Sequence, residues 1–428
     1  MDEITQQLFA PAEELAQDGI NCSAYITELT WLLFLKIAPD LDEINYLFEE
    51  FNWENLIQKD GIEQYDYYKQ ILTALAKVID PHVAGIYTDA NTALQNSEQL
   101  QIIITALNSV DASSICELGE IYEDLLAICD YEEDGHLYIA PRVLIDIMVI
   151  LIQPEVGELI QDPYAGAGNF IVAADQYIQV IADEESVQTT DFIAIEPDLI
   201  RQRLGLMNCL LHKIEHPQHV PIRWGDSLLS NRQIWPPADI VLSTLISKND
   251  TSLALLQHIS QILKPNGRAA VIVADNILAA AGAAQEVRKN LLDSCVLHTV
   301  LRLPHGILYP DEIDAHVLFF NKSTENFTEN VWFYDARNNF PSFGENLHLT
   351  REDLIDFEMV YGDDPYGLAA REDEGENGRW RCFSREYLAK HDDRLNISWL
   401  ENTEIKMNQD LLKETVEDLQ SLKGFLSV

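Results

Sequence analysis

Between residues 140 and 330 the chain alternates short apolar runs with longer stretches of helical periodicity, and this alternation limits its fold more than any other feature. The apolar runs are typical of buried strands, whereas the stretches between them place apolar residues three and four positions apart. Strand-like runs occupy residues 157–162, 191–197, 238–243, 268–275, 298–303 and 315–321, and helical patterns occupy 168–182, 199–214, 252–263 and 283–294. This order predicts an α/β fold in which helices cover a mainly parallel sheet.

The segments on either side have different patterns. Residues 1–130 contain little glycine and show helical spacing in stretches such as ELTWLLFLKIAPDLDEINYLFEEF and LGEIYEDLLAICDY. After residue 330 the pattern is mixed, with a polar loop, REDEGENGRW, and a last amphipathic helix expected at 408–426. We therefore expect an N-terminal helical domain (1–130), an α/β domain (131–330) and a C-terminal extension with a terminal helix (331–428).

The charge of the chain argues against strong binding to DNA by the isolated protein. Lys and Arg number 28 against 71 Asp and Glu, a net charge of −43, and residues 1–130 hold 24 acidic and 4 basic residues, a net of −20. Proteins that bind nucleic acid neutralise its phosphates with Lys and Arg, which is the opposite distribution. We expect weak binding to duplex DNA, and solubility alone explains an acidic surface.

Membrane segments and cysteine sites are not expected. The apolar runs are shorter than a membrane span, and the acidic start MDEITQQLFAPAEELAQDG lacks the basic flank and apolar centre of a signal peptide, so we expect a cytoplasmic protein. The cysteines show no Cys-x-x-Cys spacing, so we predict reduced thiols, without a metal site or a disulfide framework. They are Cys22, Cys116, Cys129, Cys209, Cys295 and Cys382.

The stretch LIQDPYAGAGNFIVAA, residues 159–174, is the best candidate for a ligand-binding turn. A predicted strand ends at Asp162, Pro163 turns the chain, and Gly166 and Gly168 allow the backbone to approach a ligand closely. A helix then begins near Phe170, and its N-terminus offers free N–H groups. The turn suits a nucleotide-like ligand, but it is not the GxGxxG fingerprint of nicotinamide-binding proteins.

Two further acids follow predicted strands in the order that a nucleoside site requires. Glu196 ends the strand DFIAIE, where a carboxylate can accept hydrogen bonds from both ribose hydroxyls. Asp226, in RWGDSLL, follows a third candidate strand and is placed to meet an adenine amino group. One such acid is an ordinary solvated strand end, whereas three in this order indicate a site.

The order of DPxxGxGxF, xxExD, GD and LPxGxx resembles the S-adenosylmethionine-dependent amino-methyltransferases. The chain is most similar to the modification subunits of type I restriction–modification systems, in their K-type branch. YITELTWLLFLK, LQHISQILKPNGRAAVIVADNIL and VWFYDARNNFPSFG carry this resemblance, which covers nearly the whole chain. It implies a Rossmann-like methyltransferase domain with a mixed, mainly parallel seven-stranded sheet, S-adenosylmethionine as cofactor, and adenine N6 in DNA as methyl acceptor. A specificity subunit, other modification subunits and restriction subunits are the implied partners.

The resemblance also assigns roles to residues. The cofactor turn is Asp162, Pro163, Gly166, Gly168 and Phe170, with Glu196 on the ribose and Asp226 at the adenine ring. We expect that a side chain at Gly168 blocks the cofactor without unfolding the chain. The stretch YIAPR stands where the family has a Phe-Thr-Pro-Arg element at the methionine end of the cofactor: Tyr138, Pro141 and Arg142 are assigned there, whereas Ile139 and Ala140 lack the Thr hydroxyl.

The family's catalytic Asn-Pro-Pro-Phe element is degenerate in this chain. The Asn side chain and the first Pro carbonyl accept the two N–H bonds of the target amine, and the aromatic ring stacks on the flipped adenine. The matching positions hold Thr244, Leu245, Ile246 and Ser247. They offer one short hydroxyl acceptor and no aromatic face, so we predict impaired methyl transfer.

Three functional hypotheses follow from the sequence. The chain is an active adenine-N6 methyltransferase subunit that works with a specificity subunit, or a catalytically silent relative that acts by assembly, or an acidic decoy that occupies a basic DNA-binding cleft. Loss of the Asn and the aromatic residue favours the second hypothesis over the first, and only net charge supports the third.

Overall fold

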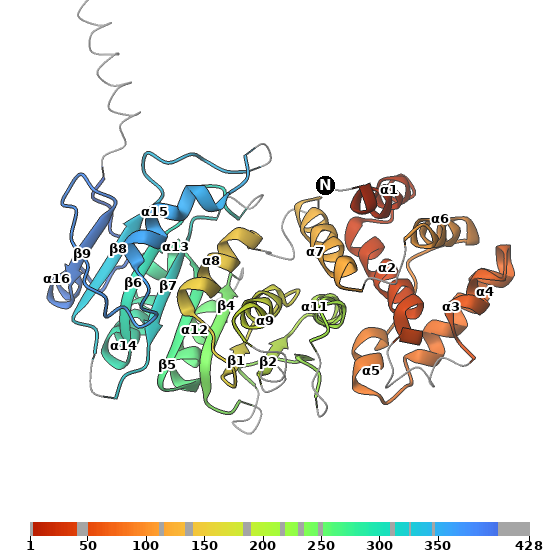
Figure 1. Ribbon diagram of the computed structural model, residues 1–428, viewed down its shortest axis with the longest axis horizontal. Helices are drawn as coiled ribbons and strands as arrows, with labels where there is room; N and C mark the ends of the chain where they lie inside the picture. Colours follow the sequence, from red (N-terminus) through yellow and green to blue (C-terminus); the bar gives the residue numbers. More distant parts are fainter. Residues whose placement is uncertain are drawn as a thin grey trace, which may run out of the picture.

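The computed structural model describes residues 3–40, 50–110, 115–132, 140–182, 190–214, 219–229, 235–246, 251–308, 313–324, 327–344 and 347–400. In these residues a nine-stranded sheet has the order β3-β2-β1-β4-β5-β7-β6-β8-β9 (Figure 1). Its strands are β1 (Leu159–Asp162), β2 (Asp191–Glu196), β3 (Ile222–Trp224), β4 (Ala238–Leu245), β5 (Leu263–Ala274), β6 (Val296–Arg302), β7 (Ala315–Asn321), β8 (Asn330–Asp335) and β9 (Trp380–Ser384).

The expected α/β class with a mixed, mainly parallel sheet is confirmed, but the sheet is larger than seven strands. Strands β1 to β5 pair in parallel, and β7 runs antiparallel to both β5 and β6. Strand β8 then pairs in parallel with β6, and β9 pairs antiparallel with β8, so the last part of the chain widens the same sheet. The pairing of β8 with β6, and of β9 with β8, joins segments that are distant in the sequence, which is why a sequence pattern alone missed it.

Helices cover both faces of the sheet, and β4 shows how the sequence divides between them. Ile240 and Leu242 pack in the core beneath α8, α9 and α15, whereas Val241 and Leu245 pack in the core beneath α12, α13 and α14. The helices are α8 (Arg142–Ile152), α9 (Asn169–Ile181), α11 (Leu199–Leu211), α12 (Thr251–Ile262), α13 (Asp275–Ala279), α14 (Ala283–Ser294), α15 (Arg351–Tyr361) and α16 (Arg385–Lys390). Apolar side chains of β4 thus point into the cores on both faces of the sheet, as expected of a central parallel strand.

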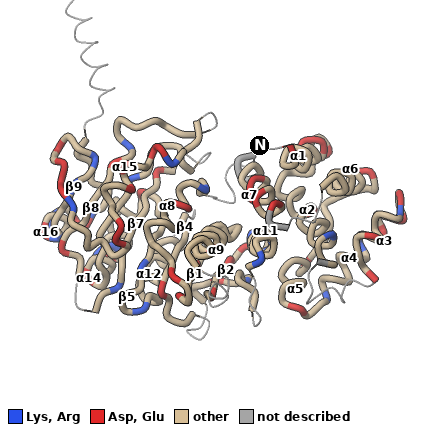
Figure 2. Tube along the Cα trace, viewed as in Figure 1, with Lys and Arg blue, Asp and Glu red and all other residues tan. Residues whose placement is uncertain are grey.

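The N-terminal region is helical, as predicted. Its elements are α1 (Glu3–Ala16), α2 (Cys22–Ile37), the 3₁₀ turn η1 (Ala38–Asp40), α3 (Trp53–Ile57), α4 (Gly61–Leu75), α5 (Pro81–Tyr87), α6 (Ser97–Asn108) and α7 (Ile115–Glu132). Figure 1 shows these helices beside the sheet, with α7 and α11 between the two parts. Acidic segments predominate over basic ones on α1 and α6 (Figure 2).

Helix α11 belongs to the core of the N-terminal helices as much as to the sheet. Leu204, Leu206 and Met207 pack with apolar side chains of α2, α5 and α7. Buried Arg203 donates from Nε to the Ile86 carbonyl (2.6 Å) and from Nη2 to the Thr88 carbonyl (2.7 Å), at the end of α5. The two parts of the molecule therefore share a packed boundary.

One cysteine pair corrects the expectation of free thiols. Cys22 at the start of α2 and Cys129 near the end of α7 form a disulfide, with their Cα atoms 5.4 Å apart. Helices α2 and α7 pack side by side, so residues 107 positions apart in the sequence become neighbours, and no spacing motif could reveal this. Cys209, Cys295 and Cys382 are free thiols, whereas the side chain of Cys116 lies outside the described residues.

Two other expectations concern segments of the chain. The terminal helix predicted at 408–426 lies outside the described residues. No helix in the described ranges is long and apolar enough to cross a membrane.

Candidate functional site

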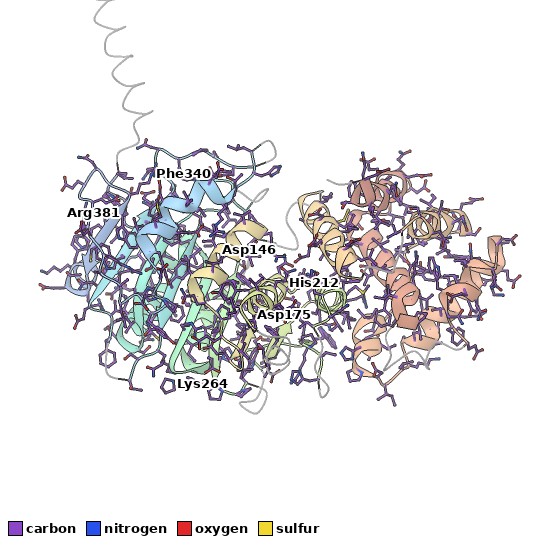
Figure 3. The ribbon with its side chains drawn as sticks, in the orientation of Figure 1. Asp146, Asp175, His212, Lys264, Phe340 and Arg381 are labelled. Atoms are coloured by element: carbon purple, nitrogen blue, oxygen red, sulfur yellow. A yellow bond between two sulfur atoms is a disulfide. The ribbon has the colours of Figure 1, made fainter. Side chains whose placement is uncertain are left out.

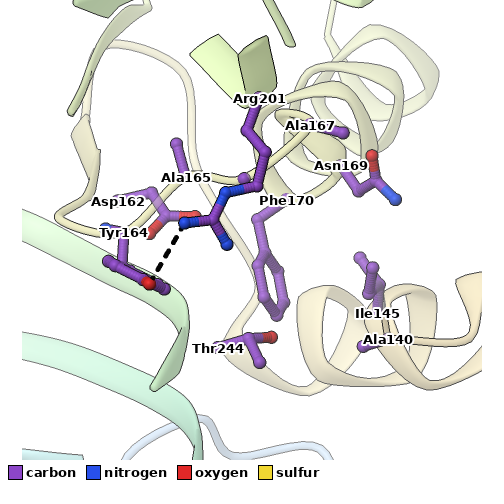
Figure 4. A pocket seen from close by; sticks show the side chains of 11 residues that line it. Ala140, Ile145, Asp162, Tyr164, Ala165, Ala167, Asn169, Phe170, Arg201 and Thr244 are labelled. Atoms are coloured by element: carbon purple, nitrogen blue, oxygen red, sulfur yellow. Dashed lines mark hydrogen bonds between the residues drawn. The ribbon is translucent and has the colours of Figure 1, made fainter. Parts of the chain in front are cut away.

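A pocket lies at the carboxyl ends of β1 and β4, at the turn between β1 and α9 (Figure 4). Parallel sheets bind ligands at this edge, because the loops that follow the strands converge there. The residues around it come from the start of α8, the turn, α11 and β4: Ala140, Ile145, Asp162, Tyr164, Ala165, Gly166, Ala167, Asn169, Phe170, Arg201 and Thr244. Of the predicted site residues, the structure brings Asp162, Gly166, Phe170 and Thr244 to this pocket.

Asp162 ends β1 and is almost wholly buried. Its Oδ1 accepts hydrogen bonds from the Ser243 hydroxyl (2.6 Å) on β4 and from the Tyr164 N–H (2.9 Å). Burial raises the pKa of Asp162 to about 7, against the effect of these hydrogen bonds, and the neighbouring charge of Glu196 raises it further. Asp162 therefore fixes the turn to β4 and titrates near neutral pH.

Replacing Asp162 with Asn should remove a pH dependence of folding stability. Because the folded-state pKa is raised from 3.8 to about 7, the native protein holds this proton more tightly than the unfolded chain, so stability falls as pH rises from about 4 to about 7. At about 1.36 kcal/mol per pKa unit, this change is up to roughly 4 kcal/mol. Denaturant unfolding at pH 4.5 and pH 8 should show a smaller difference for Asp162→Asn than for the unaltered protein. Parallel pH profiles of the two proteins would contradict the assignment.

Glu196 at the end of β2 is fully buried, and both of its oxygens have partners. Oε2 accepts the Gly166 N–H (2.8 Å), and Oε1 accepts the Asp198 N–H (2.9 Å). The Arg201 guanidinium stands 3.0 Å from Oε1 and also donates to the Tyr164 hydroxyl (3.2 Å). Burial raises the pKa of Glu196, and the charge of Arg201 opposes that rise. The carboxylate thus ties the glycine turn to the first turn of α11.

The two glycines of the turn have different roles. Gly166 (φ +54°) borders the pocket, and a Cβ there would meet open space. At Gly168 (φ +79°) a Cβ would stand 2.8 Å from Ile222 Cδ1 and 3.3 Å from the Gly205 carbonyl oxygen. A side chain at Gly168 would therefore enter the contact of the turn with α11 and β3, so we expect it to cost stability as well as to alter the turn.

A pair of substitutions separates these roles. Gly166→Asn should lower at least tenfold the affinity for a ligand that enters this pocket, with S-adenosylhomocysteine as the probe that the sequence motifs indicate, and cost about 1 kcal/mol of stability, because Asn tolerates positive φ but fills pocket space. Gly168→Ala should cost more, roughly 1–3 kcal/mol, because the added methyl overpacks the turn. Calorimetric titration and denaturant unfolding of both variants check this. Greater loss of stability in Gly166→Asn than in Gly168→Ala would contradict the geometry.

The described residues of the element predicted to bind the methionine end of the cofactor, 140–142, lie in different surroundings. Ala140 and Ile145 line the pocket, and Pro141 caps α8 at its start. Arg142 instead faces α7: Nη1 donates to Glu123 Oε2 (2.5 Å), Nε donates to Asp146 Oδ1 (2.7 Å), and Nη2 donates to Gln176.

His212 Nε2 lies 3.8 Å from the same Glu123 oxygen, and Figure 3 labels His212 and Asp146 near the boundary between the two parts. The geometry therefore gives Arg142 a bridging position between α7, α8 and α9. Tyr138 and Ile139 lie outside the described residues.

The degenerate catalytic positions continue the sheet instead of leaving it. Strand β4 extends through Leu245, and Thr244 and Leu245 pair with Ile272 and Val273 of β5. Leu245 is fully buried on one face, and Ile246 is buried on the other. Thr244 borders the pocket next to Ser243, the partner of Asp162. Ser247 lies outside the described residues.

The remaining predicted residues lie beside the pocket. The Pro163 carbonyl accepts a hydrogen bond from the Ser227 hydroxyl, which joins the turn to the loop after β3. Asp226 in that loop is exposed, and its Oδ1 accepts the Leu228 N–H (2.9 Å). Phe170, which borders the pocket itself, is the second residue of α9 and packs in the core beneath α8.

Sequence reasoning missed three polar residues of the pocket, Arg201, Asn169 and Tyr164. Asn169 Oδ1 is buried without a hydrogen-bond partner among the described residues. Arg201 could have been noticed in the sequence, because a cation in the first turn of a helix is unfavourable to the helix dipole. Its presence there suggests a nearby anionic partner.

Comparisons with known proteins agree with the fold and with the motifs. A model of the N-6 DNA methylase family matches residues 113–245 and 239–407. The methylase subunit of the type I restriction enzyme StySPI from Salmonella potsdam is 33% identical over 96% of this chain and 90% of its own length. The EcoKI methylase subunit of Escherichia coli strain K12 shows the same identity and coverage.

Solved structures lead to the same family. The crystal structure of the EcoKI M protein is 31% identical, with a TM-score of 0.57 over 100% of this chain and 97% of that one. A chain from a structural study of complex assembly in a type I restriction–modification system shares the fold at 21% identity, with a TM-score of 0.76 and coverage of 99% and 97%. The chain therefore belongs to the family of type I restriction–modification methylase (modification) subunits, a branch of the N-6 DNA methylases.

Proposed function

We propose that this chain is a modification subunit that binds S-adenosylmethionine, has lost efficient transfer to adenine, and acts through assembly with other subunits. The observation that carries the proposal is the end of β4, where Leu245 and Ile246 are buried in the two cores and Thr244 is held in the ladder with β5. Methyl transfer to adenine in this family needs the Asn-Pro-Pro-Phe element to project from the end of this strand. The proposal rests on the replacement of that element by residues that are buried in the core.

The pocket has features that fit the cofactor. The open space beside Gly166 admits a ligand close to the backbone, and the unpartnered Asn169 Oδ1 is an acceptor that calls for a donor. Glu196 would hold the ribose hydroxyls, and Gly166 and Phe170 would border the nucleoside. When bound, S-adenosylmethionine would supply an activated methyl group. Asp226, exposed after β3, would approach the adenine ring.

The proposed loss of methyl transfer to adenine follows from the few hydrogen-bond acceptors at the end of β4. The target amine requires two fixed acceptors and a stacking surface before its lone pair can attack the methyl group. Thr244 supplies one hydroxyl, and Leu245 and Ile246 supply no aromatic face. One lost transition-state hydrogen bond costs about 2.7–4 kcal/mol, and one lost base stack costs about 1–3 kcal/mol.

Assembly is the remaining role for a silent member of this family. A specificity subunit, together with other modification and restriction subunits, would bring the chain to DNA in the cytoplasm. Its net charge of −43 makes direct DNA binding unfavourable, so contact with DNA is expected only within the assembled complex.

Two measurements on the full chain test the proposal. Calorimetric titration should show binding of S-adenosylmethionine and S-adenosylhomocysteine, and size-exclusion chromatography with a type I specificity subunit from a related system should show a stable complex. A folded protein that gives neither binding heat nor a complex would disprove the proposed role. A complex without binding heat would leave assembly as the function and remove the cofactor from it.

A further inference from the structure

Arg201 places a positive charge inside the pocket. It lies in the first turn of α11, and its side chain is 14% exposed. Figure 4 shows the guanidinium extending across the pocket from α11 to Tyr164, between the turn and Phe170. Its centre lies 5.3 Å from the centroid of the Tyr164 ring. The side chain is held by an ion pair, a hydrogen bond and an aromatic face together.

The Arg201 guanidinium occupies Glu196 Oε1, an oxygen that would otherwise accept a hydrogen bond from a ribose hydroxyl. Glu196 Oε2 is taken by the Gly166 N–H, and Oε1 serves both the Asp198 N–H and Arg201. A ligand with two vicinal hydroxyls must therefore displace Arg201 from Oε1. After this displacement the guanidinium would still lie next to the ligand, because Arg201 is the third residue of α11 and its backbone is fixed in the helix. It would therefore repel a cationic ligand.

We propose that Arg201 is a built-in competitor of the cofactor, which closes the ribose end of the pocket in the free protein and lowers the affinity for S-adenosyl ligands. This inference rests on the proposed cofactor binding. The effect has two parts. Both S-adenosylhomocysteine and S-adenosylmethionine must break the contact of Arg201 with Glu196, and S-adenosylmethionine, whose sulfonium is cationic, also meets the repulsion of the guanidinium.

The test compares Arg201→Met with the unaltered protein by calorimetric titration of both ligands. Met keeps much of the aliphatic length but removes the charge and the donors. We expect S-adenosylhomocysteine to bind about tenfold more tightly to the variant, a change of about 1.4 kcal/mol, and S-adenosylmethionine to gain more than that. Arg223→Met on β3 is the matched control, and it should leave both affinities within twofold.

Each outcome decides between the two proposals. Tighter binding to Arg201→Met, including binding that the unaltered protein lacks, supports the competitor role. Equal or weaker binding to the variant, while the unaltered protein binds, overturns it and leaves the cofactor proposal intact. Absence of binding to both folded proteins overturns both proposals. Arg201→Gln, which keeps a polar group opposite Glu196, replaces the Met variant if thermal unfolding shows that the latter is misfolded.

Discussion

The unaltered chain, combined with a specificity subunit and labelled S-adenosylmethionine, should transfer methyl groups to adenine roughly 500- to 100,000-fold more slowly than an active relative. The range follows from a combined loss of about 3.7–7 kcal/mol at the target, at 1.36 kcal/mol for each factor of ten. Thr244 borders the pocket, whereas Leu245 and Ile246 are buried in the cores on either face of β4. Transfer at the rate of the EcoKI methylase subunit, measured in parallel, would refute this prediction.

Rebuilding the element should restore part of this activity, and the structure decides which variant to use. Thr244→Asn, Leu245→Pro, Ile246→Pro and Ser247→Phe together recreate the family element. Proline at 245 lacks an N–H and replaces a fully buried leucine within the β4–β5 ladder. The variant with all four substitutions should therefore lose several kcal/mol of stability.

The double variant Thr244→Asn with Ser247→Phe leaves the two buried positions unchanged. We expect it to exceed the unaltered chain at least tenfold in methyl transfer, because it regains one acceptor and the aromatic face. Thr244→Val with Ser247→Ala is the matched control and should show no gain. Failure of both rebuilt proteins, with folding and cofactor binding verified, would place the defect elsewhere, such as at Ala140.

Arg203→Ala should destabilise the protein by roughly 3–6 kcal/mol. The guanidinium makes two hydrogen bonds to carbonyls at the end of α5 and lies 5.0 Å from the ring centroid of Trp31. Charge-assisted hydrogen bonds of this kind contribute about 1.5–3 kcal/mol each, and a cation near the C-terminus of a helix adds to them. Alanine would also leave a cavity at the boundary between α11 and the N-terminal helices.

Denaturant unfolding followed by circular dichroism measures the effect of Arg203→Ala. Arg203→Met keeps most of the packing and should lose less, which separates the hydrogen bonds from the cavity. Arg223→Ala, at a partly exposed position on β3, should change the free energy of unfolding by less than about 1 kcal/mol. A loss below about 1 kcal/mol in Arg203→Ala as well would show that the boundary does not depend on this residue.

The sheet could be predicted from the sequence because its central strands carry strong local signals. Strands β1, β2, β6 and β7 fall within the expected runs or overlap them, and α14 has the bounds of the predicted helical pattern. Strand β4 was expected to end at Ser243 but continues to Leu245, because pairing with β5 extends past the apolar run. Strand β8 and the edge strand β9 depend on partners far away in the chain, so their place in the sheet was not predictable from local pattern.

The candidate site was predictable where its residues follow the end of a predicted strand, as in the turn after β1 and at Thr244 of β4. Asp162 and Gly166 lie in a single turn and meet in the pocket, together with Phe170. The direction of a side chain at Gly168 depends on α11, and the partner of Glu196 depends on the start of the same helix. The contact of Arg142 with α7 likewise joins residues that no spacing rule connects. Side-chain direction and pairing between elements are properties of the packed fold, which a linear motif does not encode.

Helix α8 contacts several parts of the molecule: residues at its start border the pocket, Arg142 pairs with Glu123 of α7, and α15 packs against it. Thermodynamic linkage makes any coupling through such a helix reciprocal. If a subunit docked on α7 or α15 changes the cofactor affinity by some factor, the cofactor changes the affinity of that subunit by the same factor. Under the proposed function, the composition of the complex would then depend on the cellular supply of S-adenosylmethionine.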